Sequence, residues 1–428
     1  KRAAFSVTMH TMSSIMMAVR NVNRWSPRAA DSGNGQGRTG MGAFETGKYR
    51  NLFLESGKSE QEIAKRLEEI WNTFFYGSEE ERLYHPAGED MGYLEDTGNH
   101  DARTEGMSYG MMICVQLDKK EEFDRIWKWA CTYMWMTEGE GEGYFAWSCG
   151  LDGRKNANGA APDGEEFFAM ALFFASHRWG DGEGIFCYSE QARKILRACL
   201  HKGENGRPGH PMWNRENKQI LFVPGIDFTD PSYHLPHFYE LFALWADEED
   251  RAFWKEAALV SRRYLKAACH PVTGMNAEYA EFDGSPMSRK LPWSNDRHDW
   301  FYSDAYRTAA NIGLDYAWFG KDEGQAQAAE KLQHFLGDVR REDPWKVYEV
   351  DGTCLAEDAL HPVGMLATTA QGALAVLGRS EDEGAVRMAW DWVERLWKEP
   401  LRKGDRRYYD NCLYFFAFLA LSGKYRIW

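Results

Sequence analysis

The stretch RTEGMSYGMM, residues 103–112, places a carboxylic acid where a polar run ends and an apolar helix begins. The apolar residues that follow recur with a helical period, so we predict that Glu105 lies in the first helical turn, with Thr104 or Ser108 as the N-cap. The glycines beside it let another molecule approach the backbone closely. A carboxyl group at a buried helix mouth is a candidate proton donor, because burial raises its pKa. On this stretch alone, a first-turn Glu that only complements the helix dipole is the simpler interpretation.

Five further polar segments occupy the same position, directly before or at the start of an apolar stretch. They are Pro162–Glu166, Asp230–Tyr233, Tyr302–Arg307, Leu360–Pro362 and Arg407–Asp410. Taken singly, Asp163 and Asp304 are ordinary helix N-caps, and His361 is more often a hydrogen-bonded structural histidine than a ligand. If these segments converge at one end of the fold, they gather titratable and hydroxyl side chains around Glu105.

The elements that must position these residues are helices, which alternate between two kinds. Amphipathic stretches rich in charge, such as EEFDRIWKWACTYMW, alternate with apolar stretches that contain small residues, such as EEFFAMALFFAS. A charged helix suits an outer ring with one face in water, and an apolar helix suits an inner ring. Six of each predict an all-α fold, an (α/α)6 barrel, with short loop strands such as Gln219–Pro224. A helical superhelix would show a fixed repeat length, which is not found. The predicted helices span 59–75, 105–118, 120–136, 163–179, 188–201, 231–246, 249–268, 303–319, 323–338, 362–377, 382–398 and 407–422.

Composition limits the class of partner. The 428 residues are 44% hydrophobic and 14% aromatic, with 18 Trp and 20 Tyr, which is more aromatic surface than a core needs. We therefore expect some aromatic side chains to line a groove. A net charge of -14 argues against nucleic acid or an anionic membrane as partner, and it favours a neutral ligand.

The eight cysteines are scattered and show neither a C-x-x-C pair nor the spacing of a zinc site, so we expect reduced core thiols. No run approaches the ~18 apolar residues of a membrane span, and the first twenty residues lack a convincing signal-peptide core. We expect a cytoplasmic protein. Residues 1–40, which end in the Gly-rich DSGNGQGRTG, are predicted to be a disordered or added extension before Met41. Residues 41–428 then form a single catalytic domain.

Long stretches of the sequence, from Met41 to Trp428, resemble glycoside hydrolase family 8. Within this family they resemble the enzymes that release xylose from the reducing end of xylo-oligosaccharides. The matching stretches are YLEDTGNHDARTEGMSYGMM (93–112), GYFAWSC (143–149), APDGEEFFAMALFFASHRWGDG (161–182), GHPMWNR (209–215), DPSYHLPHFYELF (230–242), SDAYRTAANIGLD (303–315) and RRYYDNCLY (406–414). The resemblance implies an (α/α)6 barrel that hydrolyses β-1,4-xylosidic bonds with inversion, without a metal or an organic cofactor.

The same resemblance implies roles for individual residues. Glu105 matches the general acid of the family, and Asp304 matches the general base. Asp163 matches the carboxylate that binds and distorts the sugar at the cleavage site, and Tyr233 matches the tyrosine that holds the nucleophilic water. Arg307 is expected to pair with Asp304 and keep it ionised. Inverting glycosidases need two carboxyl groups about 6.5 to 9.5 Å apart, one of them protonated, with water between them.

Substrate specificity is expected to depend on Leu360–Pro362. The resemblance implies that, as in the related exo-acting enzymes, this Leu-His-Pro loop closes the substrate site after one sugar on the reducing side of the cleaved bond. The histidine then contacts the anomeric hydroxyl of that sugar. Trp147 matches an aromatic platform for a xylose ring, although a core Trp on a strand fits the pattern equally. Tyr409 is a further candidate for substrate binding. The segment 286–299 is several residues longer than the resemblance predicts for the stretch before Asp304. We expect this extra length to change the rim of the substrate cleft.

Two alternatives remain at this point. An endo-acting family 8 enzyme, such as an endo-β-1,4-xylanase, an endoglucanase or a chitosanase, would share the fold and the acid but have an open groove. A sugar-binding protein without catalysis would retain the aromatic residues but has no need of both Glu105 and Asp304.

Overall fold

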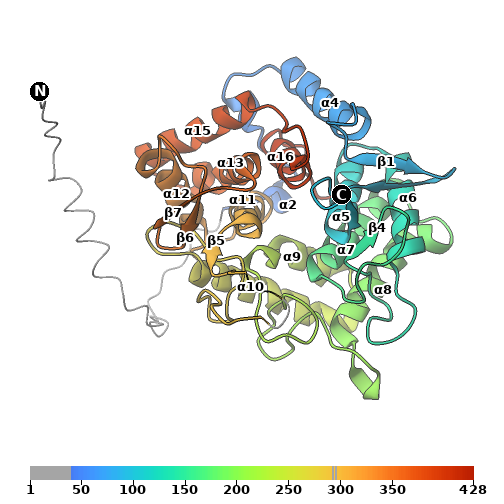
Figure 1. Cartoon of the computed structure of the whole chain (residues 1–428). Helices are drawn as coiled ribbons and strands as arrows, with labels where there is room; N and C mark the ends of the chain where they lie inside the picture. The colour runs from blue at the N-terminus through green and yellow to red at the C-terminus, as the bar shows by residue number, and fades with distance from the viewer. Residues whose placement is uncertain (1–39, 292–293, 295) are drawn as a thin grey trace, which may run out of the picture. The chain divides into compact units, whose positions relative to one another are not determined.

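Six helices of the described chain form an inner ring. The computed structural model describes residues 40–291, 294 and 296–428. The inner helices are α5 (Thr104–Gln116), α7 (Pro162–Trp179), α9 (Pro236–Trp245), α11 (Arg307–Phe319), α13 (Pro362–Gln371) and α16 (Arg407–Leu421). Each packs on the next along the chain, and α16 packs on α5, which closes the ring seen end-on in Figure 1.

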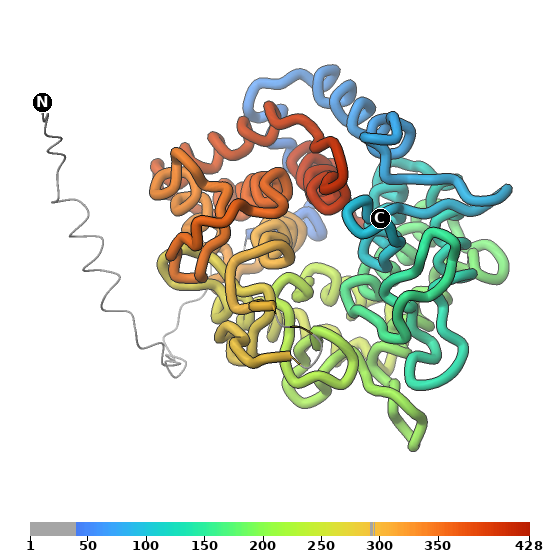
Figure 2. The backbone as a smooth tube through the Cα atoms, in the orientation of Figure 1, coloured from blue at the N-terminus to red at the C-terminus, as the bar shows by residue number. Residues whose placement is uncertain are grey.

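Six further helices surround this ring, and each lies against an inner one (Figure 2). They are α4 (Glu60–Tyr76), α6 (Lys120–Trp129), α8 (Tyr188–His201), α10 (Arg251–Ala268), α12 (Ala326–His334) and α15 (Glu383–Lys398). For example, α6 packs on α5, α8 packs on α7, and α15 packs on α13. The predicted all-α (α/α)6 barrel, with inner and outer helices alternating along the chain, is confirmed.

The two kinds of helix differ in how they bury their side chains. Every residue of α16 is buried, because inner helices contact protein on all sides. Of the 16 residues of α15, the structure buries only Ala389, Trp392, Val393 and Leu396, whose spacing defines one apolar stripe. Two of the outer helices, α4 and α15, begin with side-chain caps; in α15 the side chain of Asp382 accepts a hydrogen bond from the Ala385 N–H.

The helix boundaries depart from the predictions mainly at bends. The predicted helix 231–246 is a 3-10 turn, Pro231–Tyr233, followed by α9, because Pro236 starts a new helix. The predicted helix 362–377 is divided at Gly372, and α14 (Ala373–Arg379) continues it. Two short helices, α2 (Ala43–Thr46) and α3 (Leu52–Glu55), precede α4.

Short antiparallel strands decorate the loops. They are β1 (Tyr84–Ala87) with β2 (Met91–Leu94), β3 (Asp101–Arg103) with β4 (Ser148–Gly150), and β5 (Trp300–Phe301) with β6 (Lys346–Glu349) and β7 (Cys354–Asp358). Two of them, β3 and β5, lead directly into the segments that carry Glu105 and Asp304. The prediction of a strand at Gln219–Pro224 is wrong, because this segment makes only one isolated bridge, between Ile220 and Trp213.

The cap expected for α5 is also wrong. Arg103 occupies the N-cap position in an extended conformation without a side-chain cap bond. The Thr104 N–H donates to the carbonyl oxygen of Trp147 at 3.0 Å, and the Ser108 hydroxyl donates to the Glu105 carbonyl oxygen at 3.0 Å. The backbone of the β4 region therefore satisfies the first N–H of this helix.

All eight cysteines lie among the described residues and are free, and five of them are buried. Within the described part of the chain, no helix is both long and apolar enough to cross a membrane. Of the segment 1–40, only Gly40 is described, so the prediction for that segment lies outside the described residues.

Candidate active site

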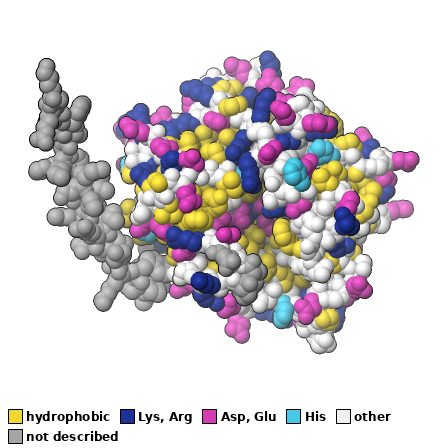
Figure 3. Space-filling model, viewed as in Figure 1, with side chains coloured by type: hydrophobic (Ala, Val, Ile, Leu, Met, Phe, Trp, Pro, Cys, Tyr) yellow, Lys and Arg dark blue, Asp and Glu magenta, His cyan; other side chains and the backbone are white. Residues whose placement is uncertain are grey.

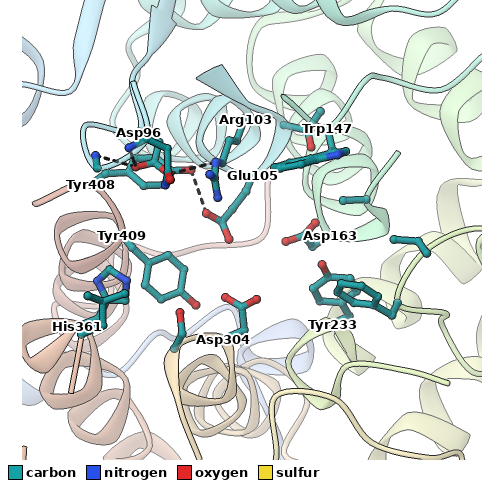
Figure 4. Close-up of a pocket in the computed structure, with 18 of the residues that line it drawn as sticks. Asp96, Arg103, Glu105, Trp147, Asp163, Tyr233, Asp304, His361, Tyr408 and Tyr409 are labelled. Atoms are coloured by element: carbon teal, nitrogen blue, oxygen red, sulfur yellow. Dashed lines mark hydrogen bonds and ion pairs between the residues drawn. The ribbon is translucent and has the colours of Figure 1, made fainter. Parts of the chain in front are cut away.

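A cavity of about 490 Å³ opens at one end of the barrel. Seven of the eight candidate site residues line it, and the eighth, Arg307, lies beneath its floor. The seven are Glu105, Trp147, Asp163, Tyr233, Asp304, His361 and Tyr409. They come from loops and helix starts far apart in the sequence, as Figure 4 shows, and acidic side chains lie in the hollow of the face seen in Figure 3.

Glu105 lies in the first turn of α5 and points into the cavity. Its Oε1 accepts a hydrogen bond from the Tyr408 hydroxyl at 2.9 Å, and its Oε2 accepts one from Arg307 Nη1 at 3.1 Å. Burial raises the pKa of Glu105, Arg307 opposes this, and the charges of Asp163 and Asp304 raise the pKa further, to about 8. Glu105 is therefore predominantly protonated at neutral pH, as a proton donor must be.

Arg307 connects the acidic residues from below. Its Nη1 also donates to Asp163 Oδ2 at 3.0 Å and to the Tyr109 hydroxyl at 2.8 Å. Its Nη2 lies 3.5 Å from Asp304 Oδ1, so the expected ion pair is present, but it is longer than the contacts of Arg307 with Glu105 and Asp163. The side chain is 5% exposed, and burial in contact with carboxylates keeps it charged. The structure therefore places Arg307 under the floor, as a residue that positions the carboxyl groups.

Asp163 lies in the first turn of α7, after Pro162, and does not act as the helix N-cap. Its Oδ1 accepts a hydrogen bond from the Gly164 N–H at 2.9 Å, and its Oδ2 faces Arg307. Burial raises the pKa of Asp163, and Arg307 opposes this shift. Gly164 is required because a Cβ there would lie 2.5 Å from the Thr104 side chain. The starts of α5 and α7 thus pack closely enough to bring Asp163 beside Glu105.

Asp304 lies in a 3-10 turn, Ser303–Tyr306, directly before α11. Ser303 has a φ of 39°, a backbone conformation that is strained for a non-glycine residue. The Asp304 side chain is 29% exposed, the most open of the four carboxyl groups that line the cavity. Because Glu105 and Asp304 contact neighbouring nitrogens of one guanidinium group, their nearest oxygens lie no more than about 9 Å apart, below the upper end of the ~6.5 to 9.5 Å range of an inverting pair.

Two tyrosines bring hydroxyl groups to the same space. Tyr233 ends a 3-10 turn, and its hydroxyl points toward Asp163 in Figure 4. The hydroxyl of Tyr409 points between Glu105 and Asp304, and it is buried without a hydrogen-bond partner among the described residues. A buried unpaired hydroxyl is costly, so this group is available for a ligand.

Trp147 precedes β4 and is 38% exposed, which excludes the alternative of a core Trp. The guanidinium of Arg103 lies 5.2 Å from the centre of its ring. Arg103 in turn pairs with Asp96 at 3.0 Å and with Asp101 at 3.1 Å. The indole is therefore held as an exposed platform at the side of the cavity next to Glu105.

His361 is held by a buried carboxylate. Its Nδ1 lies 3.1 Å from Asp410 Oδ2, which also accepts a bond from Arg402 Nη1 at 2.5 Å, while Asp410 Oδ1 accepts from the Gly364 N–H at 2.6 Å. Asp410 is thus an acceptor toward the histidine, so Nδ1 carries the proton and Nε2 is left for a ligand. Arg402 Nη1 also donates to the Leu360 carbonyl oxygen at 2.7 Å, which fixes the loop itself.

Several lining residues were not predicted from the sequence. They include Asp96, Arg103, Phe222, Tyr279 and Tyr408. The adjacent pair Tyr408 and Tyr409 at the start of a buried helix was a usable signal for Tyr408. No described residue of 286–299 lines the cavity, whereas Tyr279, just before that segment, does. Among the described residues, no group of three or more His, Cys, Asp or Glu side chains has a geometry that could hold a metal ion.

A protonated carboxyl group, a second carboxylate across a space for water, and an exposed indole in an (α/α)6 barrel define a glycoside hydrolase. A family model supports this class over nearly the whole described chain. The chain belongs to the glycosyl hydrolases family 8, whose model matches residues 41–421.

Two relatives share this family assignment with high identity. The reducing-end xylose-releasing exo-oligoxylanase Rex8A of Paenibacillus barcinonensis is 57% identical over 390 residues, which cover 91% of this chain and 99% of that protein. A reducing end xylose-releasing exo-oligoxylanase of Bifidobacterium adolescentis is 54% identical over 376 residues, or 88% and 96% of the two chains. The structure of Rex8A complexed with xylose matches with a TM-score of 0.86 at 56% identity, and covers 90% of this chain and 99% of that one.

Proposed function

We propose that this enzyme releases xylose from the reducing end of β-1,4-xylo-oligosaccharides, with inversion at the cleaved bond. The single observation that carries this proposal is the fixed Leu360–His361 loop at the edge of the cavity, where His361 Nε2 has no hydrogen-bond partner among the described residues. The high identity to two proteins named for this activity supports the same conclusion.

Glu105 is the general acid in this proposal. It gives its proton to the oxygen that leaves with the terminal xylose while the bond from that oxygen to the anomeric carbon breaks. Asp304 is the general base, which takes a proton from a water molecule as the water oxygen bonds to the same carbon. Attack from the opposite face leaves an α anomer at the new reducing end of the shortened oligomer.

The neighbouring residues hold the sugar and the water. Asp163, fixed by Arg307 and the Gly164 N–H, accepts a hydrogen bond from a hydroxyl of the sugar being attacked. Tyr233 and Tyr409 offer hydroxyls on either side of Asp304, where they orient the water and the sugar. Trp147 stacks on a sugar ring, which in xylose lacks the bulky hydroxymethyl group.

The Leu360–His361 loop permits only one sugar beyond the cleaved bond. The imidazole Nε2 accepts a hydrogen bond from the anomeric hydroxyl of that sugar, because Asp410 holds the proton on Nδ1. An endo-acting enzyme would need an open groove at this point, so the loop argues against that alternative.

The proposal is tested by incubating the protein with xylotriose and following products by chromatography and by NMR within the first minutes. We expect xylose and xylobiose only, with the new xylobiose end formed as the α anomer. Cleavage inside longer chains would indicate an endo-acting enzyme. A β anomer at the new end would refute Asp304 as a base and indicate a covalent intermediate.

We also propose a cytoplasmic location, since all eight cysteines are free. Fractionation of the source cells, followed by an activity assay of each fraction, tests this; activity mainly in the medium would contradict it.

A further inference from the structure

A second, smaller cavity lies on the barrel axis beneath the active-site floor. Its volume is about 30 Å³, and it shares Asp163 with the upper cavity. All six inner helices contribute to its wall, through Tyr109, Glu166, His237, Arg307, Gln371 and Phe416. It is thus enclosed by the same helices that carry the catalytic carboxyl groups.

Five polar atoms of the residues around this cavity have no hydrogen-bond partner among the described residues. They are Glu166 Oε1, His237 Nδ1, Arg307 Nη2, Gln371 Oε1 and the hydroxyl of Tyr425. Each of these residues is at most 4% exposed, so bulk water does not satisfy them. A buried donor or acceptor without a partner costs about 1 to 3 kcal/mol, and such groups rarely persist unpaired. Their concentration around one small cavity points to a ligand that bonds several of them.

The size and charge of the cavity identify the ligand class. A buried water needs roughly 10 to 15 Å³ of cavity volume and two to four polar partners. About two waters therefore fit the cavity of about 30 Å³. The positive charge of Arg307 disfavours a cation. Burial raises the pKa of Glu166 well above its usual value and lowers the pKa of His237 well below its own, so burial favours the neutral form of both side chains. An anion of the size of phosphate does not fit the volume.

We propose that this cavity is a structural water site, in which two waters bridge Arg307 Nη2 to the unpaired groups of Glu166, Gln371 and Tyr425. The waters position Arg307, whose Nη2 lies 3.5 Å from Asp304 and 3.8 Å from Asp230 and would without them move closer to either carboxylate. Such a turn would withdraw Nη1 from Glu105 and Asp163. Arg307 and Tyr425 are therefore positioning residues that act through the waters on the carboxyl groups above.

Direct observation is the first test. A crystal structure of the unliganded wild-type protein at about 1.5 Å resolution should show two ordered waters, each within hydrogen-bond distance of at least two of the five atoms. A cavity without water density, or side chains that bond one another directly across it, would overturn the proposal.

Function is tested with Ala310→Val, which fills the cavity from α11, and Tyr425→Phe, which removes one partner of the waters. We expect Ala310→Val to lower kcat on xylotriose about tenfold, with KM within about twofold. The basic limb of its pH profile should shift to higher pH, because Arg307 lowers the pKa of Glu105 less when the guanidinium turns away. Tyr425→Phe should show the same changes to a smaller extent.

The matched control is Tyr414→Phe, which removes a buried tyrosine hydroxyl that donates to the Glu399 carbonyl oxygen, away from this cavity. It should lower Tm without changing kcat or the pH profile. If Tyr425→Phe and Ala310→Val also change only Tm, the cavity has a structural role alone and the proposal is wrong. The crystallographic test does not depend on the substrate, so it fails or succeeds independently of the proposed function.

Discussion

Replacing His361 by alanine should show whether His361 recognises the reducing end of the substrate or only supports the structure of the loop. The imidazole is 10% exposed, and the Asp410 carboxylate holds its Nδ1 at 3.1 Å. In His361→Ala, Asp410 keeps its bonds to Arg402 and to the Gly364 N–H, so no buried charge is left without a partner. We therefore expect the variant to fold, with a modest decrease in Tm.

The loss in catalysis follows from one hydrogen bond. If Nε2 accepts the anomeric hydroxyl of the terminal xylose, the variant leaves that hydroxyl unpaired in a closed site. This costs about 1 to 3 kcal/mol of transition-state binding, or roughly 5- to 150-fold in kcat/KM on xylotriose. A trisaccharide whose reducing-end hydroxyl is replaced by hydrogen lacks this bond already and should lose little on the mutation.

The assay is kcat/KM for wild type and His361→Ala on xylotriose and on that 1-deoxy analogue. The four values form a thermodynamic cycle, and its coupling energy isolates the contact between His361 and the hydroxyl. A coupling of ~1 kcal/mol or more supports direct recognition. Equal losses on both substrates would refute it, and would assign His361 a structural role in the loop.

Three further predictions concern the acid, its titration and the core. Glu105→Gln should reduce xylotriose hydrolysis by ~10²- to 10⁴-fold with an unchanged circular dichroism spectrum; activity within tenfold of wild type would contradict its role as the acid. The pH profile of kcat/KM should fall as pH rises through about 8, because the raised pKa of Glu105 keeps it protonated below that value and its proton is lost above it; a profile flat to pH 9 would oppose this. Arg262→Ala should lower the free energy of unfolding by ~3 to 5 kcal/mol in urea titration, since Asp315, bound to Arg262 at 2.7 and 2.9 Å, would remain as a buried unpaired charge. Wild-type stability in that variant would mean that Asp315 is already neutral.

The barrel could be predicted from the sequence because its two kinds of helix have different chemical requirements. An inner helix such as α16 must be apolar on all sides, and an outer helix such as α15 needs only one stripe, so composition alone separates them. Short strands carry no comparable signal. The pairing of β3 with β4 joins residues almost fifty positions apart, and nothing local at Gln219–Pro224 distinguishes a strand from an extended loop.

The positions of the candidate site residues were predictable because helix starts at one end of the barrel converge. Their contacts were not, because they depend on side-chain directions across the axis. Arg307 was expected to pair with Asp304 alone, because the two residues are three positions apart in the sequence. Its closest carboxylate contacts are instead Asp163 and Glu105, which lie on other helices. Tyr408 was missed because its bond to Glu105 joins residues 303 positions apart in the sequence.

The arrangement around Arg307 also explains how two similar carboxyl groups can take opposite roles. Four carboxyl groups lie near one guanidinium group, those of Glu105, Asp163, Asp230 and Asp304. A single positive charge cannot balance four negative ones in a buried site, so the least hydrated groups bind protons first. The Glu105 side chain is 16% exposed and that of Asp304 is 29% exposed, so water supports the charge of Asp304 better. Burial thus raises the pKa of Glu105, which suits it to be the acid, and leaves Asp304 as the more solvent-exposed carboxyl group, which suits contact with the attacking water.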